Sequence, residues 1–229
     1  MSAFATDSIL PPPPEGALPV LHNREYRVQS YRLAEDRLLV QAALRDQRPA
    51  GISIPGDPEP LTMHHMVVEI EVQMPQLEIV AARTNIATHP HNICPDIEER
   101  YDLLVGLSIA RGFTHKVREL FGGPRGCTHT TALLQAMAPV AVQSRNGLRA
   151  ANAIAAGQPH PLVEDSDTSR FSHLSNTCHV WAEDGDLMSE VQVGGMRRPM
   201  LTVRRRLEEL GMDWQGRPLG DLADADEAE

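Results

Sequence analysis

MVVEIEVQMPQLEIVA (residues 66–81) is the stretch of sequence that decides the fold. Val68, Ile70 and Val72 fall on one face of a strand, while Glu69 and Glu71 fall on the other, and this period of two is typical of a half-buried strand. The proline-containing segment 74–76 then separates this run from a second alternating run at 77–81. The stretch therefore predicts an antiparallel hairpin with one face packed and one face solvated.

A second strand pair is expected on the N-terminal side of this hairpin. Residues 22–33 predict one strand and Glu35-Asp36 a turn, and a second strand follows in which Leu38, Val40, Ala42 and Leu44 share a face. The prolines and glycines of residues 46–60 predict a loop, and residues 84–94 are expected to be irregular.

Helical patterns dominate the middle of the chain. Helices are expected from Pro95, from Thr114 to Phe121, and from the residues after Cys127 to about Arg145, where Asn146-Gly147 should end the helix. Further on, residues 148–156 predict another helical piece, residues 158–170 a loop, residues 177–193 a hairpin and residues 200–210 a helix.

These elements predict an α+β fold, with an antiparallel sheet, helices packed on one face, and a C-terminal hairpin and helix. The proline-rich residues 1–20 are expected to form a mobile arm, residues 21–211 a single domain, and residues 212–229 an acidic tail.

Composition restricts the class of protein. The chain has 229 residues, of which 41% are hydrophobic, and a formal net charge of −10. Such a charge disfavours nucleic acid and anionic membranes as partners. No apolar run approaches the roughly 20 residues of a membrane span, and no secretory signal is visible. We therefore expect a cytoplasmic protein whose three cysteines are reduced.

The densest chemistry lies in residues 122–129, GGPRGCTH. Three glycines and a proline exclude a regular helix here, and a helix is expected to begin directly afterwards. Cys127 and His129 would then lie at a helix N-terminus, where free N–H groups favour a thiolate.

Several motifs resemble a known family. They are Cys94-Pro95-Asp96-Ile97, residues 104–109, Gly122-Gly123, residues 126–129, His22-Asn23-Arg24, residues 63–66, and Thr177-Cys178-His179 with Asp184-Gly185. In these motifs the chain resembles the bacterial family called domain of unknown function 2889, over roughly residues 22–193. The resemblance implies no activity. The arrangement of the hairpin and of cysteines at helix starts is also distantly similar to iron–sulfur scaffold and sulfur-acceptor folds, which concerns architecture alone.

Thiolate and imidazole donors indicate a zinc or iron site, for which Cys94, Cys127, His129 and Cys178 are the predicted ligands. Cys127 and His129 are also the predicted catalytic pair, as a thiol and its base. Neighbouring strand residues point to opposite faces, so at most one of His64 and His65 can face a given pocket. Whether His64, His91 or His179 joins the site stays open.

The sequence thus favours a metal-binding enzyme that acts on a small organic substrate through a Cys/His site, with zinc or iron as cofactor. A sulfur-transfer or iron–sulfur carrier, or a binding module with structural cysteines, are the alternatives. A small molecule is the expected partner, nucleic acid and membrane are not, and a homodimer stays open.

Overall fold

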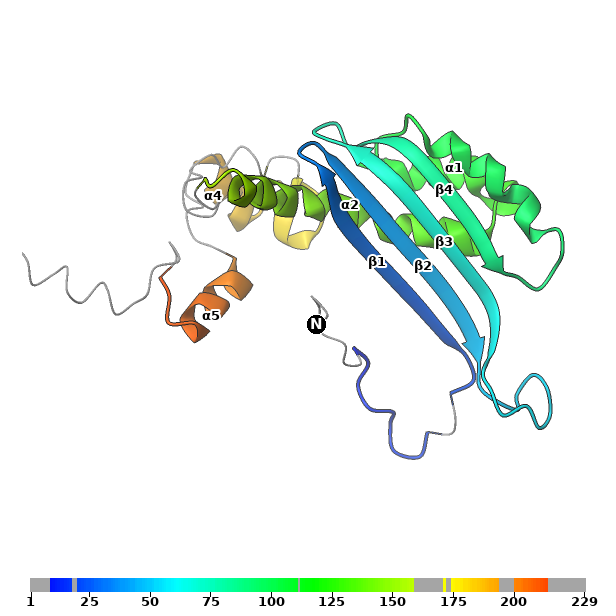
Figure 1. Cartoon of the computed structure of the whole chain (residues 1–229). Helices are drawn as coiled ribbons and strands as arrows, with labels where there is room; N and C mark the ends of the chain where they lie inside the picture. Colours follow the sequence, from blue (N-terminus) through cyan, green and yellow to red (C-terminus); the bar gives the residue numbers. More distant parts are fainter. Residues whose placement is uncertain are drawn as a thin grey trace, which may run out of the picture. The chain divides into compact units, whose positions relative to one another are not determined.

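The apolar stripes between residues 23 and 88 build a four-stranded antiparallel sheet in the computed structural model of the chain (Figure 1). Its strands are β1 (Asn23–Ala34), β2 (Arg37–Arg48), β3 (Leu61–Gln73) and β4 (Glu78–Thr88), and they pair in the order β1-β2-β3-β4. The structure describes residues 9–17, 20–110, 112–158, 171, 174–193 and 200–213. The predicted hairpin at residues 66–81 is confirmed as part of β3 and β4.

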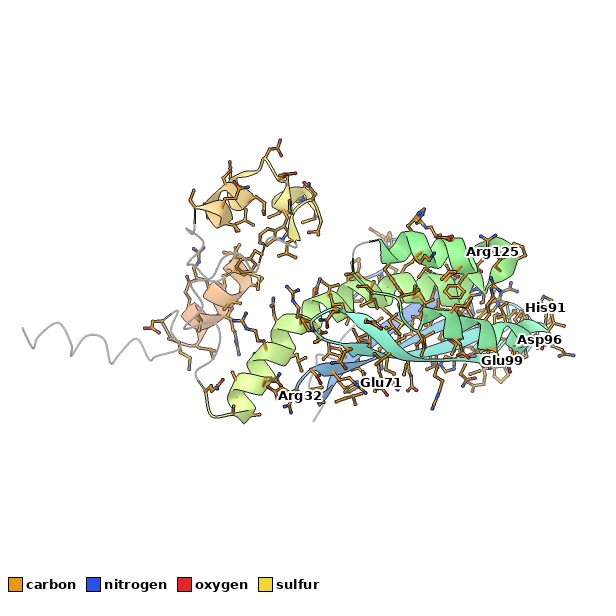
Figure 2. All side chains as sticks on the ribbon, turned by 90° about the horizontal axis from the view of Figure 1, so that it is seen from above. Arg32, Glu71, His91, Asp96, Glu99 and Arg125 are labelled. Atoms are coloured by element: carbon orange, nitrogen blue, oxygen red, sulfur yellow. The ribbon has the colours of Figure 1, made fainter. Side chains whose placement is uncertain are left out.

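The sheet has one packed face and one open face, as its alternation predicts. The packed face carries the buried even-numbered side chains of the two central strands, Leu38, Val40, Ala42, Leu44, Met66, Val68, Ile70 and Val72. The open face carries polar cross-strand pairs, such as Gln41 with Glu69 and Arg37 with Glu71. In Figure 2, Glu71 marks this open face and Arg125 marks the helical layer on the other side.

Helical segments cover the packed face. They are the 3₁₀ helices η1 (Cys94–Leu104) and η2 (Gly123–Arg125) and the α-helices α1 (Phe113–Phe121) and α2 (Thr128–Ala155). Their buried residues include Tyr101, Leu104, Val117, Phe121, Leu133, Leu134 and Met137. A hydrogen bond of 2.6 Å between the hydroxyls of Ser30 and Ser144 joins β1 to α2, and the Ile86 N–H donates to the Glu98 carboxylate, which joins β4 to η1. The predicted α+β class is confirmed.

The glycine-rich turn before α2 has a steric reason. A Cβ on Gly122 would lie 2.3 Å from the Arg118 carbonyl oxygen, and a Cβ on Gly126 would lie 2.5 Å from that of Phe121. The chain therefore passes too close to the end of α1 for any side chain at these positions. This tight turn fixes the position of Cys127, the residue directly before α2.

Several predicted boundaries are wrong. Residues 46–48 belong to β2 instead of the predicted loop, and β4 continues to Thr88 through the segment expected to be irregular. Asn146-Gly147 does not end the helix, because α2 continues to Ala155. A glycine in a helix interior costs only about 1 kcal/mol, which good helix formers around it offset.

The chain divides into two compact units, Met1–Arg145 and Asn146–Glu229. The described part of the second unit contains η4 (His179–Trp181), α4 (Asp186–Gln192) and α5 (Leu201–Glu209). The predicted helix at 200–210 is confirmed, but the predicted C-terminal hairpin is wrong. Gly185 precedes α4 and Asp186 lies in its first turn, while Met188 and Val191 are buried at helical spacing. A sequence that resembles a hairpin turn therefore starts a helix.

The boundaries predicted for the domain at residues 21 and 211 stay predictions, and the predicted loop at 158–170 lies outside the described residues except for Gln158. No helix in the described part of the chain is long and apolar enough to cross a membrane.

Candidate functional site

The candidate site is built around a carboxylate on the packed face of the sheet. Asp46 continues the apolar stripe of β2 that includes Ala42 and Leu44, and only 1% of it is exposed. The strand register places Arg24 of β1 opposite Asp46 on one side and His64 of β3 opposite it on the other. Three neighbouring strands thus bring a cation, an anion and an imidazole into one row.

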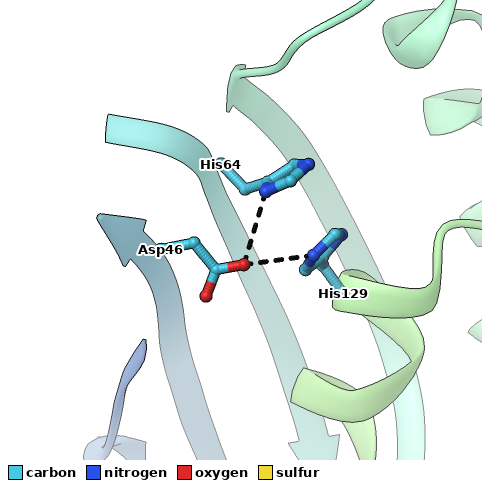
Figure 3. A group of neighbouring side chains, drawn as sticks. All are labelled: Asp46, His64 and His129. Atoms are coloured by element: carbon cyan, nitrogen blue, oxygen red, sulfur yellow. Dashed lines mark ion pairs between the residues drawn. The ribbon is translucent and has the colours of Figure 1, made fainter. Parts of the chain in front are cut away.

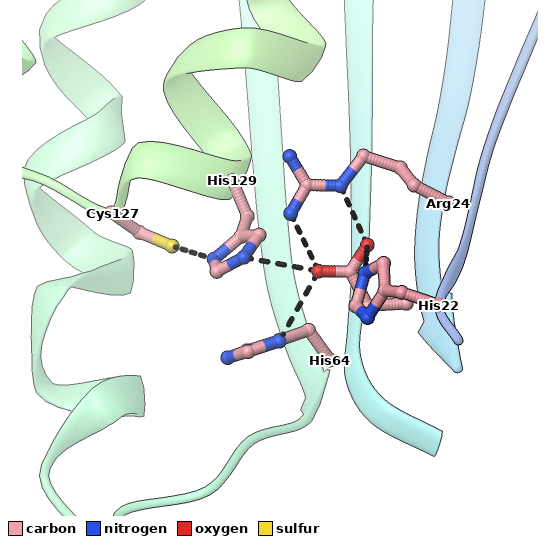
Figure 4. A network of polar contacts seen from close by, with 6 residues as sticks. His22, Arg24, His64, Cys127 and His129 are labelled. Atoms are coloured by element: carbon pink, nitrogen blue, oxygen red, sulfur yellow. Dashed lines mark hydrogen bonds and ion pairs between the residues drawn. The ribbon is translucent and has the colours of Figure 1, made fainter. Parts of the chain in front are cut away.

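Arg24 holds Asp46 as a bidentate partner. Its Nε donates to Oδ1 and its Nη2 donates to Oδ2, each at 2.6 Å (Figure 4). This hydrogen bonding lowers the pKa of Asp46 to about 2, against the opposing effect of burial. The half-exposed His22 adds its Nε2 at 3.5 Å from Oδ1. Asp46 is therefore ionised under all ordinary conditions, with one oxygen, Oδ2, turned towards the helices.

Two imidazoles converge on that oxygen. His64 Nδ1 lies 3.3 Å from Asp46 Oδ2, and His129 Nε2, from the first turn of α2, lies 3.2 Å from it (Figure 3). The two rings stack with centroids 3.9 Å apart and planes inclined by 26°. The side chains of His64 and His129 are only 22% and 17% exposed. The site is therefore a largely buried cluster made by β2, β3 and α2.

The surroundings of both imidazoles favour the neutral form. Burial is the main cause that lowers the pKa of His64 and of His129, and for His129 the neighbouring His64 lowers it further. The Asp46 carboxylate opposes these effects without cancelling them. Neutral imidazole is the form that binds metal ions.

The distances in the cluster suit a metal better than a hydrogen-bond network. His64 Nδ1 is buried and makes no hydrogen bond of acceptable geometry, although Asp46 Oδ2 is 3.3 Å away. Ligand atoms bonded at about 2.0–2.2 Å to one tetrahedral ion lie roughly 3.3–3.6 Å from one another. Among the described residues, Asp46, His64 and His129 form the one group of three or more such side chains whose ligand atoms lie within 4.8 Å of one another. Each donor is of a type that zinc and iron accept.

Cys127 adds a thiol next to this cluster. Its Sγ lies 3.7 Å from His129 Nδ1, and its backbone N–H donates to the Tyr101 hydroxyl at 2.8 Å. Cys127 precedes the first residue of α2, and its carbonyl accepts the N–H of Thr131. The residues of a regular helix two positions apart point away from each other, but Cys127 lies before the helix begins, and its sulfur contacts the ring of His129.

The site residues predicted from the sequence lie in different parts of the fold. Cys127 and His129 are brought together, and His64 on the packed face joins His129, while His65 belongs to the opposite face of β3. Cys94 begins η1 and is half-buried, and it forms no three-ligand group with Cys127 and His129. Cys178 is exposed in the second unit, which also contains His179, and His91 accepts a hydrogen bond from the ring of His89 through its carbonyl. The joint site of Cys94, Cys127, His129 and Cys178 stays a prediction.

Sequence reasoning missed Asp46 and Arg24. Asp46 was expected to open a loop, yet a signal was present, because it follows Leu38, Val40, Ala42 and Leu44 at the same period of two. A carboxylate that continues an apolar stripe predicts a buried charge, and a buried charge requires a partner.

The metal-free protein is expected to lose stability in acid in two steps. Asp46 has a folded pKa of about 2, below its unfolded value, so its contribution is present above about pH 5 and lost as the pH falls towards 2. Discounted for the partly exposed Arg24, this step is about 1–2 kcal/mol. The folded pKa values of His64 and His129 are lowered, so the unfolded chain binds protons more readily at these residues. The free energy of unfolding therefore already decreases as the pH falls below about 6.5. Urea unfolding from pH 8 to 3 measures both, and Asp46→Asn should lack the step below pH 5; an unchanged profile in that variant would contradict the assignment.

Comparison with known proteins gives one match. A family described as "protein of unknown function (DUF2889)" matches residues 22–143, which is more than half of the chain and contains the whole cluster. No curated protein and no solved structure matches the chain, so the likeness to iron–sulfur scaffold and sulfur-acceptor folds stays a prediction. The matched range contains Asp46 and His64 of the sheet, the glycine-rich turn before α2, and residues 127–129 at the start of α2. The chain belongs to the DUF2889 family.

Proposed function

We propose that this protein binds one zinc or iron ion through Asp46, His64 and His129 and uses it as an enzyme on a small organic substrate. The observation that carries the proposal is the position of two neutral imidazole nitrogens at 3.2 and 3.3 Å from one carboxylate oxygen. These distances are close to the roughly 3.3–3.6 Å that separates two atoms bound to the same tetrahedral metal ion.

The number and type of ligands favour catalysis over a structural role. Structural zinc sites are closed by four protein ligands, while catalytic sites keep a position for water or substrate. Two histidines and one carboxylate with open positions are also the ligand set of non-haem iron enzymes. A bound ion at such a site supplies Lewis acidity and lowers the pKa of bound water.

The charges around the cluster favour an anionic substrate. Arg24 contacts both oxygens of Asp46 and so neutralises the only acidic member of the cluster. The two histidines are neutral for the reasons given above. A divalent ion would therefore keep most of its positive charge, which attracts a small molecule with a carboxylate or a similar group.

Metal content of the protein tests the proposal. Protein purified without a polyhistidine tag and analysed by elemental mass spectrometry is expected to contain close to one zinc or iron per chain. Apoprotein titrated with Zn²⁺ or Co²⁺ should bind one ion, and X-ray absorption of the loaded protein should show nitrogen and oxygen neighbours near 2.0–2.2 Å. Absence of binding at micromolar metal would overturn the proposal, and the cluster would then be a structural ion-pair network.

A second candidate function is thiol chemistry at Cys127. The contact between Cys127 Sγ and His129 Nδ1, with His129 Nε2 directed at Asp46, has the order of a nucleophile, its base and an orienting carboxylate. Sulfur transfer, proposed as an alternative from the sequence, would use the same thiol. This candidate requires metal-free protein whose Cys127 reacts with iodoacetamide much faster than Cys94 at pH 7, and equal rates would contradict it.

A further inference from the structure

We propose that Cys127 is a positioning residue of this site, whose sulfur accepts the Nδ1–H of His129 when Nε2 of the same ring binds the metal. The inference rests on the proposed metal function. Cys127 was expected from the sequence to be a ligand; here its sulfur instead contacts the side of the imidazole that faces away from the cluster (Figure 4).

The two nitrogens of His129 have different partners. Nε2 lies 3.2 Å from Asp46 Oδ2, on the side of the three-ligand cluster, and Nδ1 lies 3.7 Å from Cys127 Sγ. A nitrogen that binds a metal must carry no proton, so a neutral imidazole bound through Nε2 carries its proton on Nδ1. That N–H then needs an acceptor, and the Cys127 sulfur is the acceptor at this position. Metal-bound histidines commonly have such a partner on the other nitrogen.

The same geometry argues against Cys127 as a direct ligand of the ion. One imidazole separates its sulfur from Asp46 Oδ2, because the ring contacts the sulfur through Nδ1 and the carboxylate through Nε2. A sulfur ligand must approach the ion to about 2.3 Å. The sulfur therefore contacts Nδ1 of His129, while Asp46 lies beside Nε2 on the other side of the ring.

The backbone of Cys127 is held independently of the cluster. Tyr101, 1% exposed, accepts the Cys127 N–H at 2.8 Å, and its hydroxyl lies 3.4 Å from the Cys127 carbonyl. The Tyr101 ring stacks on Phe121 with a centroid distance of 4.7 Å. Gly126, next to Cys127, has no room for a Cβ. These contacts keep the sulfur at one place relative to α2, as a positioning role requires.

The first test follows the Nδ1–H of His129 in Zn²⁺-loaded protein, because without metal the Asp46 carboxylate, a stronger acceptor than a thiol, takes the proton on Nε2. ¹⁵N–¹H NMR of the loaded full chain is expected to show a protonated Nδ1 whose hydrogen exchanges slowly with water. In Cys127→Ala this N–H loses its acceptor and should exchange faster, and Cys127→Ser, which keeps an acceptor, should lie between the two. Cys94→Ala, a half-buried cysteine of the same unit, is the matched control and should leave the His129 signals unchanged.

The second test measures the affinity for Zn²⁺. Cys127→Ala should bind Zn²⁺ about 10–100-fold more weakly, as is usual when the partner of a ligating histidine is removed. Its X-ray absorption spectrum should match that of the wild type, with no sulfur neighbour in either. Circular dichroism and thermal melting check that each variant is folded, and Cys127→Ser replaces Cys127→Ala if the latter is not.

The outcomes separate the two proposals. If wild-type protein binds no metal, the proposed function fails and the positioning role fails with it. If wild-type protein binds one ion but Cys127→Ala changes neither the exchange of the Nδ1–H nor the affinity, the proposed function stands and the positioning role is overturned. A sulfur neighbour at 2.3 Å in loaded wild-type protein would likewise overturn it and make Cys127 a ligand.

Discussion

Replacing Asp46 by alanine is expected to lower the free energy of unfolding of the metal-free protein by about 2–4 kcal/mol. Asp46 is 1% exposed and is the common partner of Arg24, His64 and His129. Removing it leaves the Arg24 guanidinium without its counter-charge and the two neutral imidazoles without the neighbouring carboxylate, and breaking a buried pair on one side costs about 3–5 kcal/mol. The smaller value is expected here because the Arg24 side chain, 38% exposed, can turn to water.

The control lies on the opposite face of the same sheet. Glu71 pairs with Arg37 at 3.4 Å, with the two side chains 36% and 41% exposed. Glu71→Ala should cost no more than about 1 kcal/mol, as is usual for a surface pair. Urea unfolding in the presence of a chelator measures both variants. Equal losses would mean that burial of Asp46 does not set the strength of its contacts.

Removing either histidine of the cluster is expected to abolish stoichiometric metal binding. His64→Ala or His129→Ala takes away one of three ligand groups. The affinity for Zn²⁺ should fall by roughly 100-fold or more, because even an outer-shell partner is worth about 10–100-fold. His65→Ala is the matched control, since this neighbouring histidine of β3 belongs to the opposite face of the strand and should keep the full metal content.

The cysteine variants decide between this cluster and the ligand set that the sequence predicted. Cys94→Ser and Cys178→Ser should retain one ion per chain if Asp46, His64 and His129 are the ligands. Loss of metal in either of them, with binding unaffected in His64→Ala, would restore the joint site of Cys94, Cys127, His129 and Cys178. Competition titrations with a chromophoric chelator measure all of these affinities on one scale.

The sequence by itself determined the sheet and the tight turn before α2. Alternation in residues 38–44 and 66–81 is a local property of the chain, because the side chains of a strand alternate between its faces whatever surrounds it. The same rule separated His64 from His65. The glycines of residues 122–126 likewise indicated a tight turn, and the structure adds the nearby carbonyls of α1 that require it.

Only the tertiary structure decided which polar side chains meet. Strand register places Arg24 and His64 beside Asp46, and these two residues lie 22 and 18 positions from Asp46 along the chain, so local pattern cannot pair them. The C-terminal segment shows the same limit: Asp184-Gly185-Asp186 suits a hairpin turn and a helix start equally well, and the burial of Met188 and Val191 selects the helix. Local sequence sets the direction of each side chain along its own element. Long-range packing decides which side chains become its neighbours, and a binding site is formed by side chains that are neighbours in space.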